Sequence, residues 1–549
     1  MVAGHSKQNT RFADAANNLG ELRLRNEEDN TIIFIPTPTN DPNDPLNWPK
    51  AYRVYIAVLV SFAIFFSNFL AAGPTVAIVS ITETFFGEAG AAFDDQLAKV
   101  AYLFTTTALI QGMSNLVWMP CIAKYGRRPV YVTSFVFYTA FATWAGGATT
   151  YGSSLAARML MGFASGASEC LAPLTISDLF FLHERGTIMA IYTTALSTGV
   201  GCGIIVAGLI TINHDWRYIY WVTVALIGSC TLLIIFTFPE TVYHRSDRTQ
   251  MMVNNSPTNL PHDTAFEDWE FNPKLNPDNA TVDHSSHEFP PKPTYLQTLS
   301  MYSGIHTEES FMKVLIRPVV LLALPSVLWA TLVMAVTVGF LVAITTDFAV
   351  AYEDTYGFEP WQAGLCFVAC PVGAGIGAFF GGRFSDIVAD RLTRGNNGIR
   401  QPEMRLPAMI ISVFAAPLAL ILYGVGIDRA WHWIVPTVGL GLLNFSIVQA
   451  TNISLVYTID SYRPVAGELA VTQHAFKSAF GFLLSFYTNP WIDASGYTQS
   501  FGAMAGISGG VLLLWIPMYV WGRRVRQATW TWGFIEDLVH WHRDREVGE

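Results

Sequence analysis

The chain has 549 residues, of which 51% are hydrophobic and only 13% charged, whereas soluble globular proteins carry about 25% charged residues. Apolar runs succeed one another from about residue 52 to residue 521, and a helix needs roughly 20 apolar residues to cross a bilayer. This composition excludes an ordinary soluble protein and predicts an all-α, polytopic membrane protein. The net charge of −10 comes from acids spread over loops and tails, so we expect no nucleic-acid partner.

Taken in chain order, the apolar runs predict twelve transmembrane helices in two groups of six. We place them at 52–74, 97–122, 129–150, 154–180, 186–212, 216–238, 316–346, 361–383, 405–427, 431–458, 465–490 and 497–522. The predicted parts are an N-terminal tail (1–51), a six-helix half (52–238), a polar linker (239–315), a second six-helix half (316–522) and a C-terminal tail (523–549). All six cysteines fall in or at the ends of spans, which favours packing roles over disulfides or metal ligands.

The orientation follows from lysine and arginine in the short loops, which mark the cytosolic side. Basic residues gather after spans 2, 4, 8 and 12, at Lys124, Arg127 and Arg128, at Arg185, at Arg391, Arg394, Arg400 and Arg405, and at Arg523, Arg524 and Arg526. We therefore expect cytosolic termini, a cytosolic linker and insertion in the plasma membrane. The linker sequons at Asn254 and Asn279 would then stay unglycosylated.

Two short motifs recur in the second half. "PCIAKYGRRPVYV" follows span 2 and "GGRFSDIVADRLTRG" follows span 8, while "TISDLFFLHERG" and "TIDSYRPVAG" follow spans 4 and 10. Each copy of the second motif places an aspartate at a helix end with an arginine after it. Basic loops alone are ordinary topology signals, but the matched positions indicate a charge network that locks the halves and breaks when they rock. The gating candidates in these motifs are Lys124, Arg127, Arg128, Asp178, Arg185, Asp386, Asp460 and Arg463.

These residues carry a resemblance to a known family. "AKYGRRPVYV" from Ala123, "ARMLMGFASGA" from Ala157, "FPETVYHR" from Phe238 and "DPNDPLNWPK" from Asp41 resemble motifs of the major facilitator superfamily, in its fungal twelve-span drug:proton antiporter branch. Fungal polyamine-type carriers are similar too. The resemblance implies a monomer in the bilayer that carries a small organic solute and protons, with no enzymatic activity and no cofactor. It also implies a gating role for Arg158, in the fourth-span motif.

Two departures from the family pattern stand out. Ala123 replaces the aspartate that usually precedes the basic residue, so we expect any aspartate-centred gating network to depend on Asp386 in the second half. Val200 and Ile204 stand where the antiporter motif of span 5 carries prolines. The glycines of that stretch still allow close helix packing, but the missing prolines leave import and export open.

Facilitator-type folds bind solute near the midplane, between the halves. By span position the polar midplane residues are Asn68, Gln111, Glu169, Trp329 (near the inner half of span 7), Asn444, Gln449, Asn452, His474 and Lys477. Gln449 and Asn452 are three residues apart, so we expect them to share a helix face, and likewise His474 and Lys477. Amides inside spans are also common as simple contacts between helices, and a tryptophan is commonly a packing residue or an interface anchor.

Glu169 is the most informative of these residues, because a charge near the bilayer centre costs on the order of 2.5–3.5 kcal/mol on insertion scales. Arg158 is about 16 Å away along the same helix, too far to pair with it. A structural interpretation is a buried salt bridge with Lys477. The functional interpretation is a carboxylate that binds a proton or a cationic substrate in turn, as its surroundings change.

The sequence therefore predicts a proton-coupled secondary transporter of small organic solutes. Efflux of drugs or secondary metabolites is favoured over uptake of polyamines or other organic cations. A primary pump is disfavoured, since there is no G-x-x-x-x-G-K-[ST] loop, and a membrane enzyme would need a denser catalytic cluster than "DLFFLHERG". A non-transporting nutrient receptor on the same fold remains as an alternative from another class.

Overall fold

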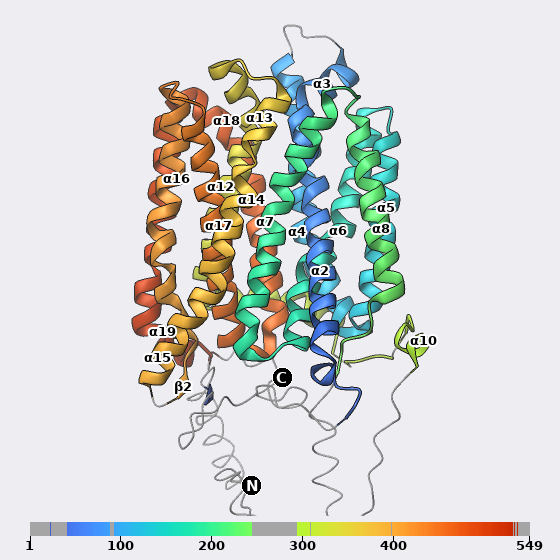
Figure 1. The fold of residues 1–549 in the computed structure, drawn as a ribbon, viewed down its shortest axis with the longest axis vertical. Helices are drawn as coiled ribbons and strands as arrows, with labels where there is room; N and C mark the ends of the chain where they lie inside the picture. The colour runs from blue at the N-terminus through green and yellow to red at the C-terminus, as the bar shows by residue number, and fades with distance from the viewer. Residues whose placement is uncertain are drawn as a thin grey trace, which may run out of the picture.

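The computed structural model describes residues 22–23, 41–87, 93–243 and 294–530, apart from 303, 308 and 397, together with 532 and 535. The expectations for the sequons and for most of the linker and tails therefore lie outside the described residues. Figure 1 shows the described chain as a bundle of long, roughly parallel helices. The first group comprises α2 (Lys50–Ala72), the 3-10 turn η2 (Gly73–Ala77), α3 (Ile78–Phe86), α4 (Phe93–Tyr125), α5 (Arg127–Gly147), α6 (Tyr151–Leu179), α7 (Leu182–Thr211) and α8 (Arg217–Thr237).

The second group comprises α11 (Phe311–Leu321), α12 (Pro325–Tyr356), α13 (Pro360–Cys366), α14 (Ala369–Phe379), the π-helical turn η3 (Phe380–Phe384), α15 (Ser385–Gly395), the 3-10 turn η4 (Pro402–Met409), α16 (Ile410–Asp428), α17 (Ile434–Ser461), α18 (Ala466–Leu513) and α19 (Trp515–Trp530). Short elements flank these helices: η1 (Pro45–Asn47), α10 (Tyr295–Thr298), η5 (Arg463–Val465), and the strands β1 (Leu22–Arg23) and β2 (Ile399–Arg400), which pair antiparallel. The predicted all-α membrane fold is confirmed. Within the described ranges, nine helical segments are long and apolar enough to span a membrane.

One of those nine segments, Ala466–Trp530, contains more than one crossing. Gly496 interrupts α18 with a φ of 77°, a left-handed conformation that glycine adopts without strain. The hydroxyl of Ser500 donates to the carbonyl of Trp491 at 3.2 Å, although a straight helix would separate residues nine apart by about 14 Å. The chain therefore reverses at Gly496, between the two predicted final spans.

The seventh span lies further along the chain than its apolar run predicts. Instead of one helix over 316–346, the structure has α11 ending at Leu321 and α12 beginning at Pro325. Leu324 is extended and Pro325 occupies the first turn of α12, where a missing N–H is tolerated. Apolar residues continue across this break, so hydropathy alone does not reveal where the helix starts.

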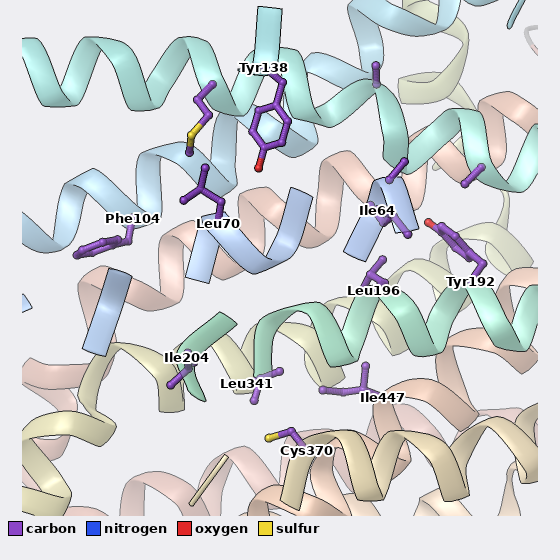
Figure 2. Packing of buried hydrophobic residues seen from close by; sticks show 14 of the residues in the cluster. Ile64, Leu70, Phe104, Tyr138, Tyr192, Leu196, Ile204, Leu341, Cys370 and Ile447 are labelled. Carbon is purple, nitrogen blue, oxygen red and sulfur yellow. The ribbon is translucent and has the colours of Figure 1, made fainter. Parts of the chain in front are cut away.

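We call α2–α8 the first half and α11–α19 the second half. The basic end is the end of the bundle where α2 begins at Lys50 and α19 ends at Trp530; the other is the opposite end. A hydrophobic cluster joins the halves, and Figure 2 shows Leu196 and Ile204 of α7 together with Leu341 and Ile447 of the second half.

Glycine allows α7 to approach both halves closely. A Cβ at Gly201 would lie 2.8 Å from the Cβ of Cys370 on α14, and a Cβ at Gly203 would lie 2.3 Å from the carbonyl oxygen of Phe69 on α2. Larger side chains at these positions would force the helices apart. The glycine-rich stretch that departs from the antiporter motif thus packs α7 tightly, without proline.

Candidate functional site: a charge network between the halves

Glu169 lies on α6, ten residues before the helix ends at Leu179 and therefore about 15 Å from the basic end. Its side chain is 1% exposed. A Cβ at Gly166 would lie 2.2 Å from the carbonyl oxygen of Gln111, so this glycine lets α4 come close enough to reach the carboxylate. The small residues of α6 thus bury the acid and bring polar groups of α4 to it.

The carboxylate of Glu169 is held by an ion pair and two amides. Lys477 Nζ lies 2.9 Å from Oε1, and Gln111 Nε2 donates to the same oxygen at 3.3 Å. Asn115 Nδ2 donates to Oε2 at 3.1 Å. Since α6 belongs to the first half and α18 to the second, this buried pair links the halves, and the salt bridge considered from the sequence is confirmed.

His474 and Tyr192 extend the network. The hydroxyl of Tyr192 donates to the backbone carbonyl of Glu169 and lies 3.1 Å from His474 Nε2. Because that hydroxyl proton is used on the carbonyl, Nε2 is the donor and Nδ1 carries the lone pair. Nδ1 lies 3.5 Å from Lys477 Nζ and 3.6 Å from Glu169 Oε2. His474 can therefore accept a proton at Nδ1 beside the carboxylate.

Two members of this network were not predicted. Asn115 is four residues after Gln111 and so lies on the same face of α4; this spacing could have identified it. Tyr192 is a tyrosine within an apolar span, and its spacing carries no comparable signal. Its hydroxyl is placed by the packing of α7 against α6.

The predicted amides of α17 separate into different roles. Asn444 Oδ1 accepts from Ser197 Oγ of α7 at 2.7 Å, a second polar link between the halves. Gln449 instead contacts its own half, where it accepts from Ser412 of α16 at 2.5 Å. Asn452 Nδ2 donates to the carbonyls of Gly381 at 2.8 Å and Gly186 at 3.3 Å, towards the basic end. Gln449 and Asn452, three residues apart on α17, therefore contact different neighbours.

Asn68 and Trp329 donate their side-chain hydrogen bonds to backbone carbonyls and not to the carboxylate of Glu169. Asn68 donates to the carbonyl of Ile64 on its own helix at 3.0 Å, and its Cβ would be 3.2 Å from a Cβ at Gly199. Trp329 is four residues after the start of α12, near the basic end, where its indole donates to Val511 at 3.1 Å. Trp329 therefore lies towards the basic end of α12, since the helix starts later than its apolar run suggests.

At the basic end, the first half has an acidic network of its own. Arg127 Nε lies 3.2 Å from Asp178 Oδ2. Glu240, after α8, accepts the backbone N–H groups of Arg127 at 2.9 Å and Arg128 at 3.1 Å. Arg128 donates its guanidinium to the carbonyls of Phe238 and Ile235. Asp178 and Glu240 thus supply carboxylates to this first-half network, in which Ala123 supplies none.

Contacts between the halves form beside this network. Arg185 Nη1 of α7 lies 4.0 Å from Asp460 Oδ1 of α17, and Thr187 donates to Asp386 at 3.2 Å. Asp386 also pairs with Arg405 at 2.8 Å. Burial lowers the pKa of Arg463 to about 10, an effect that Asp460 opposes. The arginine and aspartate of the repeated motifs therefore pair across the halves.

Two gating candidates lie apart from these contacts. Lys124 contributes its backbone carbonyl, which accepts from His306 at 3.0 Å. Arg158 lies near the opposite end, where Nε donates to the Tyr220 hydroxyl at 2.6 Å and the guanidinium covers the Phe104 ring at 4.6 Å. Arg158 does not join the network of the basic end, because α6 separates it from Asp178 by about 30 Å.

The chain is similar to known membrane transporters. The Major Facilitator Superfamily profile matches residues 54–472. An uncharacterised MFS-type transporter of Schizosaccharomyces pombe is 28% identical over 530 residues, covering 92% of this chain and 89% of that protein. Protein HOL1 of Saccharomyces cerevisiae is 24% identical over 545 residues, covering 91% of each.

Two solved structures share the fold. The human organic anion transporter MFSD10 (TETRAN) matches with a TM-score of 0.54 at 16% identity, over 85% of this chain and 100% of that chain. The proton:xylose symporter XylE matches with a TM-score of 0.57 at 15% identity, over 86% of this chain and 97% of that chain. At these identities the likeness concerns the fold alone.

Proposed function

Since the chain belongs to the major facilitator superfamily, we propose that it is a proton-coupled secondary transporter of small organic solutes. The observation that supports this proposal most directly is the buried pair of Glu169 and Lys477, which links the two halves. The attraction between these two side chains depends on whether Glu169 is protonated. It can therefore couple proton binding to the relative movement of the halves.

The proposed cycle uses one carboxylate for two ligands. A proton that binds Glu169 removes its charge and with it the attraction to Lys477, so α6 and α18 can separate. Loss of the proton restores the pair. A cationic solute that reaches Glu169 competes with both the proton and Lys477, and this mutual exclusion is the requirement for antiport. His474 Nδ1, 3.6 Å from the carboxylate, is the nearest relay for the proton.

The contacts of the basic end are the proposed gate. Arg185 with Asp460, Thr187 with Asp386, and Asn452 with the carbonyl of Gly186 all cross between the halves. Each must break for that end to open. The excess of arginine there supports a cytosolic basic end, and we assign the protein to the plasma membrane.

We propose efflux of drugs or secondary metabolites as the direction, because the motifs at 123–132 and 238–245 resemble the drug:proton antiporters. Uptake of polyamines or other organic cations is the second candidate. Two observations favour it: α7 runs without proline from Leu182 to Thr211, and Glu83, Asp354 and Glu359 are exposed towards the opposite end. Exposed acids raise the local concentration of cations.

The test is a solute screen in proteoliposomes with an imposed pH gradient. Labelled polyamines, aromatic cations and neutral aromatic compounds are offered to the wild-type protein and to Glu169→Gln, with Glu353→Gln as an exposed-acid control. We expect gradient-driven movement of at least one class in the wild type and the control, and its loss in Glu169→Gln. The side on which solute accumulates identifies efflux or uptake. No gradient-dependent movement of any class would favour the non-transporting receptor.

A further inference from the structure

A second buried carboxylate lies in the second half, away from the Glu169 network. Asp347 is on α12, nine residues before the helix ends at Tyr356 and therefore about 14 Å from the opposite end. Its side chain is 7% exposed, and among the described residues its Oδ2 has no hydrogen-bond partner. The hydroxyl of Tyr423 on α16, fully buried, likewise has no partner within the described chain.

The surroundings of Asp347 are aromatic and acidic. Tyr497, just beyond the reversal in α18, hydrogen-bonds to the carboxyl group. Its ring stacks on Phe501 with centroids 6.2 Å apart, and Phe501 in turn lies 5.0 Å from the ring of Tyr423. The charged groups that act on Asp347 are Asp493 of α18 and Asp354, two turns along α12, and both are acids.

This arrangement suits a carboxylic acid better than a carboxylate. A buried negative charge without a cationic partner is costly, and neighbouring acids add repulsion. A protonated group removes both penalties, and it still accepts the hydrogen bond of Tyr497. We propose that Asp347 is a second proton-binding site of this protein, separate from Glu169.

The two sites are distant but share a helix. Lys477, the partner of Glu169, precedes Asp493 by sixteen residues, which corresponds to about 24 Å along α18. On this helix, a movement that separates Lys477 from Glu169 also shifts Asp493, one of the acids that act on Asp347. On the proposed function, opening of the opposite end would hydrate Asp347 and let it exchange its proton there. Only this role depends on the protein being a proton-coupled transporter.

Infrared spectroscopy of the purified full-length protein in detergent tests the site directly, because a protonated carboxylic acid has a C=O stretching band that a carboxylate lacks. We expect one such band to appear in the wild type as the pH is lowered from neutral into the mildly acidic range, and to be absent from Asp347→Asn. The band should persist in Asp354→Asn, an exposed acid on the same helix, and in Glu169→Gln. It should disappear again on titration to higher pH.

A band unchanged in Asp347→Asn would overturn the proposal, since Asp347 would then be ionised. If that variant does not fold, Tyr497→Phe serves instead: loss of the donated hydrogen bond should shift the band, and an unmoved band would count against the site. Transport failure in the solute screen leaves the infrared result intact, so the two proposals can fail independently. A transporting Asp347→Asn protein with an unaltered pH profile would refute the role in coupling alone.

Discussion

The buried pair of Glu169 and Lys477 makes a strong energetic prediction. Each side chain is almost fully buried and each is the nearest counter-charge of the other, at 2.9 Å. In Glu169→Gln the ammonium group of Lys477 loses its negatively charged partner inside the protein. The N–H₂ group of the new glutamine also faces the amide donor of Gln111 or Asn115. Removing one member of a buried pair typically costs about 3–5 kcal/mol. We expect a loss of that size in Glu169→Gln and a comparable loss in Lys477→Met.

The double variant should be far less damaged than the sum of the two. Glutamine and methionine leave no buried charge, and replacing both members of a buried pair by uncharged residues is often nearly neutral. The coupling free energy between positions 169 and 477 should therefore be about 3 kcal/mol or more in the stabilising sense.

Equilibrium unfolding of the purified variants in mixed micelles measures this cycle. Glu353→Gln, at an exposed position near the end of α12, is the surface control and should change stability by less than about 0.5 kcal/mol. Losses that simply add in the double variant would show that the pair contributes no coupling. If each single variant loses less than about 1 kcal/mol of stability, the pair of Glu169 and Lys477 behaves like an ion pair screened by solvent. Either outcome would refute the buried link between the halves.

Three further predictions concern the basic end. Asp460→Asn should slow turnover several-fold with little change in solute affinity, since its partner lies at the gate, and a large affinity loss with normal turnover would place Asp460 in the binding site. Gly186→Ala should hold the basic end open, because the new Cβ would lie 2.4 Å from Asp386 Oδ1. The labelling of cysteines at the basic end should therefore rise. Gly375→Ala, which has open space around its new Cβ, should leave that labelling unchanged. Glu240→Gln should lower the stability measured by thermal unfolding by about 1–3 kcal/mol, because the amide group replaces one acceptor of backbone N–H groups by a donor. An unchanged melting temperature would show that Glu240 does not stabilise the start of α5.

Several site residues could be identified from the sequence because they are costly in an apolar span. Glu169, His474 and Lys477 stand out for this reason, and the structure brings all three together. Their mutual distances could not be deduced, since His474 and Lys477 are about 300 residues from Glu169 and meet only when the two halves pack. Asn115 follows from its spacing to Gln111, whereas no pattern singles out Tyr192.

Depth and helix face were less predictable. Trp329 lies nearer the start of its helix than the apolar run suggests, because that run continues through Leu324 to the helix start at Pro325. Gln449 and Asn452 are three residues apart, which leaves about 60° between their directions on a helix of 3.6 residues per turn. Since α17 is buried on all sides over this region, 60° is enough to direct one amide to α16 and the other to α7.

The most direct test of the account is proton movement driven by solute. Wild-type and Glu169→Gln proteins are reconstituted with a pH-sensitive dye inside the vesicles, and a transported solute from the screen is added on one side. The account predicts a solute-dependent pH change with the wild-type protein. Glu169→Gln should show none, while still exchanging labelled solute down its gradient. A variant that moves protons with solute at the wild-type rate would contradict the assignment of coupling to Glu169.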